Sequence, residues 1–143
     1  MLLGIYPSIL DTDNSLILPD EIQKEYKDGL YIARGFDRNI MVLTVQAFEV
    51  IYDRITKLNL ADPVARMLLR MILSTAHQAE LTSEGKIQIP EALKRFANLM
   101  HEVMLIGQGD FMELWSPEFW HNQEEQLLNV DANHFSTLNI TTR

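Results

Sequence analysis

The sequence contains an internal repeat, and this repeat limits the folds open to the chain more than any other feature. In residues 11–19 and again in residues 82–90, a polar turn leads through alternating apolar residues to a proline, and the two prolines lie 71 residues apart. At this spacing Leu16 aligns with Ile87. A repeat of this kind predicts two copies of one structural unit that bury their apolar faces together.

The alignment extends along both copies. It covers the short segment after each proline and two later apolar segments, with a small slippage in the loop before the last three matches. The further matched pairs are Leu18 with Ile89, Asp20 with Glu91, Ile22 with Leu93, Met41 with Met112, Leu43 with Leu114 and Phe48 with Phe119.

Each copy has the same predicted elements. Alternation of apolar and polar residues at a period of two is typical of a half-buried strand. Proline fits the first position of a helix, so Pro19 and Pro90 are expected to end this strand and to open a short helix, at 91–99 in the second copy. Two strands joined by a turn follow. In the first copy the strands are 30–33 and 40–43 and the turn is 35–39. In the second copy the strands are 103–106 and 111–115 and the turn is 107–110.

Helical segments lie between and after the copies. Residues 46–57 carry apolar residues at helical spacing, and Asp62 with Pro63 favours the start of a second helix that runs to about Ala76. Residues 121–143 are polar and predict a short helix followed by a loose tail. We therefore predict an α+β fold with a mainly β core: a first repeat at 5–48, connecting helices at 49–75, a second repeat at 76–120 and a tail at 121–143.

Charge and composition narrow the possible partners. Twelve Lys and Arg face twenty Asp and Glu, which gives a net charge of −8. Phosphate contacts need a basic surface, so a DNA-binding interpretation has to overcome this balance. The chain has no cysteine, which excludes disulfides and thiolate metal sites and favours an intracellular location. No apolar run approaches the ~20 residues of a membrane helix, so we expect no membrane partner.

No motif in the sequence predicts catalysis. The histidines, at positions 77, 101, 121 and 134, lack the spacing of zinc ligands. There is no Gly-x-Ser-x-Gly elbow and no phosphate-binding loop, and no pair of carboxylates is marked out for acid–base chemistry. We therefore expect no enzyme activity, no metal, no cofactor and no small-molecule substrate.

Several motifs of the chain resemble those of the MraZ family and follow one another in the same order. The resemblance covers roughly residues 1–123 and rests on the segments 11–19, 34–38, 62–66, 81–90, 102–108 and 113–116 and on Trp120. It implies two swapped-hairpin units of the AbrB-like type that form a double-split barrel with added helices. It also implies a ring-shaped homo-oligomer that regulates transcription of the bacterial division and cell-wall gene cluster by binding direct repeats in its own promoter.

The resemblance also points to the DNA-contacting residues. The family carries Asp-x-x-x-Arg in the turn of each copy, usually within Asp-x-Lys-Gly-Arg. In the first turn Asp11 is kept, whereas Asp13, Asn14 and Ser15 replace the Lys, Gly and Arg. In the second turn Thr82 replaces the Asp, Gly85 is kept and Lys86 replaces the Arg. The candidate DNA-binding residues are thus Lys86, which is the main contact, Gly85, Ser15, Asn14, Asp11 and Thr82. Three further cations, Arg38, Lys94 and Arg95, are expected to assist Lys86.

Two functions follow from this pattern. The first is a sequence-specific DNA-binding transcriptional regulator in the cytoplasm and on the nucleoid, with promoter DNA as its partner and weak binding per subunit. The second is a diverged member of the family that keeps the oligomeric ring but serves as a protein-interaction module. The first is our main prediction and the second is the alternative. Both turns lack the arginine whose guanidinium can grip phosphate or guanine with two hydrogen bonds, so the predicted DNA binding is weak per subunit.

Overall fold

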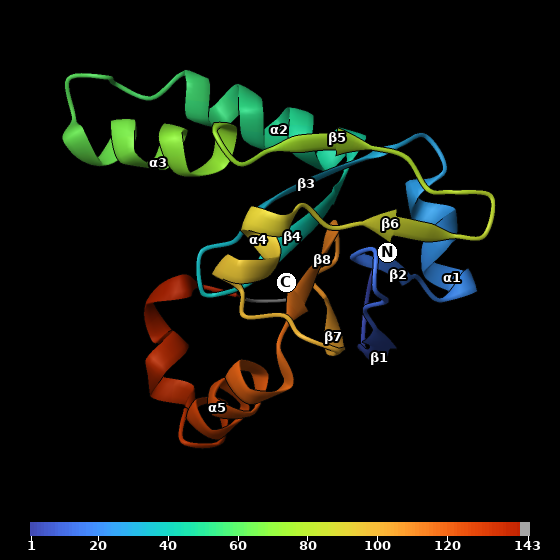
Figure 1. Cartoon of the computed structure of the whole chain (residues 1–143). Coiled ribbons are helices and arrows are strands. Elements are labelled where there is room, and N and C mark those ends of the chain that lie inside the picture. Colours follow the sequence, from blue (N-terminus) through green and yellow to red (C-terminus); the bar gives the residue numbers. More distant parts are fainter. Residues whose placement is uncertain (141–143) are drawn as a thin grey trace.

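The computed structural model describes residues 1–140, apart from the side chain of Ala132. The fold is a mixed α+β fold with an antiparallel core and several helices, as predicted (Figure 1). In chain order the elements are β1 (Ile5–Ile9), β2 (Ser15–Ile17), α1 (Asp20–Gln23), the 3-10 turn η1 (Lys24–Tyr26), β3 (Leu30–Arg34), β4 (Ile40–Thr44), α2 (Val45–Thr56), α3 (Pro63–Leu73), β5 (His77–Ala79), β6 (Lys86–Gln88), α4 (Glu91–Phe96), β7 (Glu102–Gly107), β8 (Phe111–Trp115), α5 (Pro117–Leu128) and the 3-10 helix η2 (Ala132–Leu138).

Both sheets contain strands from both halves of the chain. The larger sheet has the order β1-β7-β8-β4-β3-β5, and the smaller one pairs β2 with β6. Each half has a β3–β4 or β7–β8 hairpin, and the first strand of the other half pairs with that hairpin: β1 with β7, and β5 with β3. The two hairpins meet through β4 and β8 at the centre. Neither half therefore has a complete sheet of its own.

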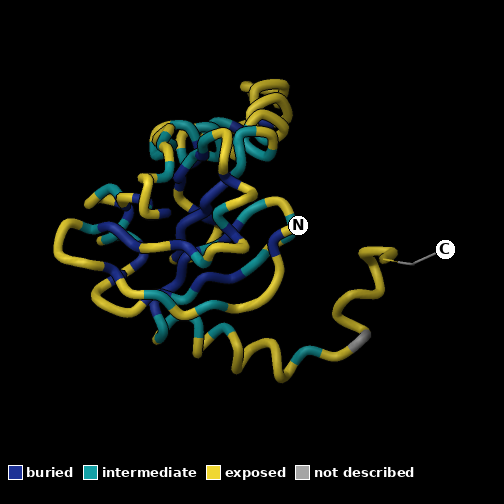
Figure 2. The backbone as a smooth tube through the Cα atoms, turned by 90° about the vertical axis from the view of Figure 1, so that its right-hand side faces the viewer, coloured by how far each residue is buried: buried dark blue, intermediate teal, exposed yellow. Residues whose placement is uncertain are grey.

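Two apolar cores lie on opposite faces of the β3–β4 hairpin. The main core includes Leu16 and Ile87 of the small sheet together with Ile32 and Val42 of the large one. The second core lies under α2 and α3 and includes Met41. Figure 2 shows the α2–α3 helices above the buried strands. Because both faces are covered, β4 is buried at four consecutive positions, Ile40–Leu43, and shows no alternation.

The packing corrects the sequence alignment of the last strands. Ile40 and Val42 lie in the main core, and so do Met112 and Leu114 of β8. The structural match is therefore Ile40 with Met112, and the sequence match of Met41 with Met112 is one residue out. The offset between the copies is therefore 72 residues at these strands, one more than the 71 between the two prolines.

Helix starts agree with this corrected match. The hydroxyl of Thr44 accepts a hydrogen bond from the amide of Ala47 at the start of α2, and the hydroxyl of Ser116 accepts one from the amide of Phe119 at the start of α5. Phe48 therefore corresponds to Trp120 and not to Phe119. The Ser116 cap and Pro117 also explain why the last helix begins at Pro117, earlier than the predicted start at residue 121.

Most of the other predicted strands and helices are confirmed, but two strands were missed and two helices end earlier than predicted. The strands predicted at 30–33, 40–43, 103–106 and 111–115 are confirmed, as is the helix predicted at 46–57. Strands β1 and β5 were missed, because they are mostly exposed edge strands without a clean apolar pattern. Helix α3 ends at Leu73, before the predicted Ala76, and α4 ends at Phe96, before the predicted residue 99. In the predicted tail, η2 spans Ala132–Leu138, and residues 141–143 lie outside the described part. Within residues 1–140, no helix has the length and apolarity to cross a membrane.

Candidate nucleic-acid interface

The two turns predicted to contact DNA have the same backbone hydrogen bonds. In the first turn the Asp11 amide donates to the Ser15 carbonyl at 2.9 Å, and the Asn14 amide donates to the Asp11 carbonyl at 3.1 Å. In the second turn Thr82 and Lys86 form the same pair at 2.9 Å, and the Gly85 amide donates to the Thr82 carbonyl at 2.9 Å. The turn conformation is thus preserved although the two sequences differ.

A side-chain oxygen closes each turn from its first residue. Oδ1 of Asp11 accepts a hydrogen bond from the Ser15 amide at 2.9 Å, and Oγ1 of Thr82 accepts one from the Lys86 amide at 3.0 Å. Aspartate and threonine can both supply this acceptor, so the replacement of Asp by Thr keeps the turn closed. The first role of Asp11 and Thr82 is therefore to hold the turn.

The fourth position of each turn requires a left-handed backbone. Asn14 has φ of 65° and Gly85 has φ of 80°. Glycine adopts this conformation without steric cost, and asparagine is among the few other residues that tolerate it. The exchange of Gly for Asn in the first turn is therefore compatible with the same geometry.

The turns lie at opposite ends of the β2–β6 ladder and are tied to it reciprocally. The Leu18 amide donates to the Gly85 carbonyl at 3.0 Å, and the Ile89 amide donates to the Asn14 carbonyl at 2.7 Å. Each turn also packs on the short helix of the other half of the chain. The Asn14 side chain donates to Glu91 at 2.7 Å and accepts from Lys94 at 2.9 Å, whereas Gln23 of α1 lies directly over Gly85.

Lys86 is flanked by carboxylates. Its Nζ lies 3.5 Å from Oδ2 of Asp11 and 3.7 Å from Oε2 of Glu84, and its side chain is 36% exposed. A hydrogen bond with the Asp13 side chain, the amide of Ser15 and the Lys86 ammonium all help to hold the pKa of Asp11 below its usual value. Asp11 therefore stays ionised beside Lys86, and a phosphate would have to compete with two carboxylates for the ammonium.

Not every predicted site residue lies at an accessible turn surface. Ser15 is buried, with 7% exposure, and Gly85 is also buried. Arg38 lies in the β3–β4 loop, where its Nε donates to the Phe96 carbonyl at 2.8 Å and its guanidinium lies 5.4 Å from the Phe96 and Phe119 rings. The structure thus joins Asp11 and Lys86 through an ion pair but does not bring Arg38 into contact with either turn.

Sequence reasoning missed two residues at this surface. Glu84, at the usual lysine position of the family motif, faces Lys86. Gln88 on β6 donates from its side-chain amide to the Asp13 carbonyl at 3.0 Å and so ties the first turn to the second strand. The alternation of residues 86–89 could have placed Gln88 on the same outward face as Lys86.

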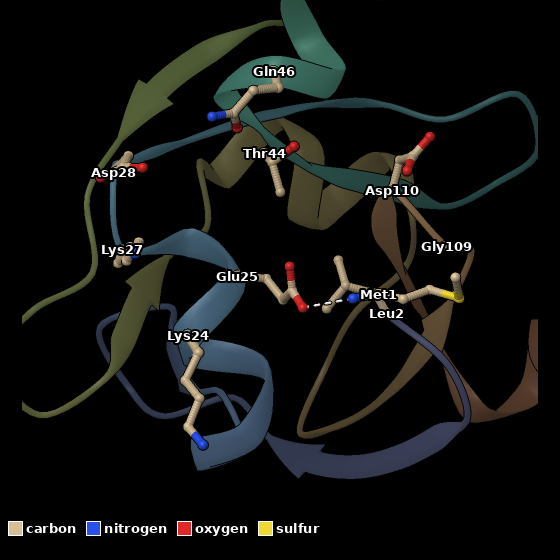
Figure 3. A pocket seen from close by; sticks show the side chains of 10 residues that line it. All are labelled: Met1, Leu2, Lys24, Glu25, Lys27, Asp28, Thr44, Gln46, Gly109 and Asp110. Atoms are coloured by element: carbon tan, nitrogen blue, oxygen red, sulfur yellow. Dashed lines mark hydrogen bonds and ion pairs between the residues drawn. The ribbon is translucent and has the colours of Figure 1, made fainter.

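Within residues 1–140, no group of three or more His, Cys, Asp or Glu side chains could hold a metal ion. A cavity of about 570 Å³ lies between the chain start, η1 and the β7–β8 loop (Figure 3). There the Met1 ammonium donates to Oε1 of Glu25 at 2.6 Å, while the side chain of Lys24 points away from this pair (Figure 3). The lining is mixed in charge.

Comparison with known proteins decides the family. Residues 72–139 match the family model described as "MraZ protein, putative antitoxin-like". The chain is 30% identical to "Transcriptional regulator MraZ" of Clostridium acetobutylicum over 98% of this chain and 100% of that protein. This chain belongs to the MraZ family. MraZ regulators of the same printed name from Clavibacter michiganensis subsp. michiganensis and Micrococcus luteus are 37% and 33% identical, over 84% and 85% of both chains. The resemblance drawn from the sequence motifs is thereby confirmed.

Proposed function

We propose that this MraZ-family chain is a sequence-specific DNA-binding transcriptional regulator of the division and cell-wall gene cluster. The proposal is supported by the relatives, whose printed name is transcriptional regulator. The matches to them cover 98% and 84% of this chain. That name is not a class of enzyme, and we propose no catalytic role, cofactor or small-molecule substrate. Promoter DNA is the proposed partner, and the cytoplasm and nucleoid are the proposed location.

The proposed architecture is a double-split barrel of two swapped-hairpin units, at 5–48 and 76–120, with connecting helices at 49–75 and a tail at 121–143. Its support is the exchange of first strands, in which β1 pairs with β7 and β5 with β3. The matching N-caps of Thr44 and Ser116 suggest that each unit also includes the helix that follows it.

The observation that carries the DNA-binding proposal is the pair of equivalent turns on one small sheet. Both turns keep the same hydrogen bonds, so the β2–β6 ladder presents two similar loops at its ends. We propose that Lys86 is the principal cation for phosphate. One lysine per subunit neutralises about one phosphate, far below the ~6–10 contacts of tight DNA binders. We therefore propose that a ring-shaped homo-oligomer presents several such turns to spaced promoter repeats, since linked sites gain ~10²–10⁴ in affinity.

Titration of the protein's own upstream DNA tests this proposal. Fragments with one, two and three direct repeats are bound at a low and a high salt concentration, and affinity is measured by fluorescence anisotropy. Affinity should rise steeply with the number of repeats and fall steeply with salt. Tight binding to a single repeat that is insensitive to salt would contradict the account.

A protein-interaction module is the second candidate, and the flanking of Lys86 by Asp11 and Glu84 favours it. The first turn adds Asp13, and Glu91 and Lys94 both bond to the Asn14 side chain, so the acidic side chains around Lys86 outnumber the basic ones. Such a surface repels phosphate and suits a basic protein partner. Absence of binding to any promoter fragment, at either salt concentration, would select this alternative.

A further inference from the structure

The equivalent helices α2 and α5 differ in how much of their surface is packed against other elements of the chain. Helix α2 follows β4 and helix α5 follows β8, and the hydroxyl caps Thr44 and Ser116 align them residue by residue. In this alignment Ile55 of α2 corresponds to Leu127 of α5. Ile55 is only 6% exposed because α3 packs on α2, whereas Leu127 is 51% exposed and no residue of α5 is buried. Within residues 1–140, no helix covers α5 as α3 covers α2.

The open surface on α5 is apolar and hollow. We define the α5 face by Ile5, Trp120, Leu127 and Leu128, which line a groove of about 450 Å³ between β1 and α5. Ile5 is 49% exposed and Leu128 is 84% exposed. An apolar surface of this kind, built on a helix that lacks its packing partner, is typical of a site for another helix.

Helix α3 has a second apolar surface of its own. Ala65 and Ile72 are buried on its inner side, but Val64 and Met67 point outward and are 69% and 65% exposed. We define the α3 outer face by Val64, Met67 and the neighbouring Phe36, which is 69% exposed. These three residues line one groove of about 480 Å³. Helix α3 is therefore apolar on two sides and uses only one of them within the chain.

The charges of the two helices are complementary. Helix α3 carries Arg66 and Arg70 and no acidic residue. Helix α5 carries three glutamates, Glu118, Glu124 and Glu125, and no Lys or Arg. Opposite charges around apolar contacts steer two surfaces together and disfavour the pairing of each helix with its own kind. Contact between two α5 helices or two α3 helices would place like charges side by side.

We propose that the α3 outer face of one subunit docks on the α5 face of a second copy of this chain. Helix α3 would then lie between α2 of its own subunit and α5 of its neighbour, and would cover both equivalent helices. The two surfaces are different, so the contact is head-to-tail and each subunit keeps one free face of each kind. Repetition of such a contact forms a closed ring when the rotation between subunits closes. This inference rests on the proposed ring and names the surfaces that build it.

Two aspartate variants test the contact separately. Met67→Asp blocks the α3 outer face, and Leu127→Asp blocks the α5 face. Each places a charge at an exposed position, so the fold should survive, which circular dichroism and thermal unfolding check. Light scattering should show that the ring mass of the wild type falls to, or close to, the 16.5 kDa of one chain in each variant. Met100→Asp is the matched control, because Met100 is 76% exposed and lies on neither face, and its ring should stay intact.

Mixing the two variants makes the test specific for a head-to-tail contact. Met67→Asp retains an intact α5 face, and Leu127→Asp retains an intact α3 outer face. An equimolar mixture should therefore form a dimer with one chain of each kind and nothing larger. The inference would be overturned if either variant assembled to the wild-type mass, or if the mixture stayed monomeric. In both cases a ring of the wild-type chain would leave the ring proposal itself intact. A wild-type chain that is itself monomeric would overturn both the ring proposal and this contact.

Discussion

Lys86 is the single residue on which the DNA-binding proposal depends most. It holds the arginine position of the family motif, and its ammonium lies 3.5 Å from Asp11 and 3.7 Å from Glu84. The ion pairs are partly exposed, so each contributes little to folding stability. Their larger effect is on binding, because the carboxylates compete with phosphate for the only lysine of the turns.

Replacement of Lys86 by Ala should therefore weaken binding to multi-repeat promoter DNA. The slope of log affinity against log salt should flatten by about one unit per subunit engaged, because one phosphate contact is lost. Glu84→Gln should change affinity in the opposite direction, because it removes a competing carboxylate. Lys57→Ala is the control, since Lys57 pairs with Asp53 on α2, far along the chain from the turns. Equal affinity of Lys86→Ala and wild type would remove Lys86 from the interface.

Glu113 is a half-buried carboxyl with a separate consequence for stability. Partial burial raises its pKa, and the nearby Asp37 carboxylate adds to the rise, while the hydrogen bond from the Trp115 indole, at 3.0 Å, and the neighbouring Asn39 side chain oppose it. The folded chain therefore keeps a proton that the unfolded chain releases. Stability should fall as pH rises from the ordinary glutamate pKa of about 4.5 through the higher value of the folded state, and the loss remains at neutral pH.

Glu113→Gln removes this charge and keeps an acceptor for the Trp115 indole. The variant should be more stable than wild type at neutral pH, and the difference should vanish as the pH falls below the ordinary glutamate pKa. Urea unfolding at an acidic and a neutral pH measures this. Glu49→Gln, at an exposed position of α2, should change stability little at either pH. A variant that is less stable than wild type at neutral pH would contradict the assignment.

At the scale of elements, the two long helices start in the same way although their sequences differ. Thr44 opens α2 and Ser116 opens α5, each with its hydroxyl bonded to the amide three residues on. A hydroxyl at this position satisfies an amide that would otherwise lack a partner in the first helical turn. The caps thus define where both copies pass from sheet to helix.

Thr44→Ala and Ser116→Ala should each lower the free energy of unfolding by about 1 kcal/mol. Thr56→Ala serves as the control, because its hydroxyl donates to carbonyls at the end of α2 and caps no helix start. Its effect should stay within about 0.5 kcal/mol. Urea unfolding of the three variants compares them directly. If the Ser116 variant were as stable as wild type, α5 would not depend on its cap.

At the scale of the whole molecule, DNA binding and assembly are expected to be coupled. The chain carries a net charge of −8, so a single subunit has little attraction for DNA. Several turns held at a fixed spacing gain affinity together, without new contacts at any one turn.

Met67→Asp should therefore lose promoter binding along with the ring, although Met67 lies on α3 and in neither turn. The loss on a three-repeat fragment should be ~10²-fold or more, whereas binding to a one-repeat fragment should change little. Anisotropy titration of both fragments measures the ratio, with Met100→Asp as the folded, assembled control. Equal loss on both fragments would mean that Met67 acts on the DNA contact itself.

The sequence by itself determined the repeat, the turns and most of the elements. Prolines at 19 and 90, apolar alternation before them and residues that accept a left-handed backbone at 14 and 85 are local signals, and local signals are read along the chain. The family motifs are likewise contiguous. These features therefore required no knowledge of which segments lie side by side.

Only the tertiary structure decided which strands pair and what surrounds the candidate site. Strands β1 and β5 are short edge strands whose pairing depends on the hairpin of the other half, so no local pattern marks them. The same holds for the ion pair of Lys86 with Asp11, which joins the two copies, and for the partial burial of Glu113. Such contacts arise from packing between segments far apart in sequence, and the free energy that selects them belongs to the assembled core rather than to any one segment.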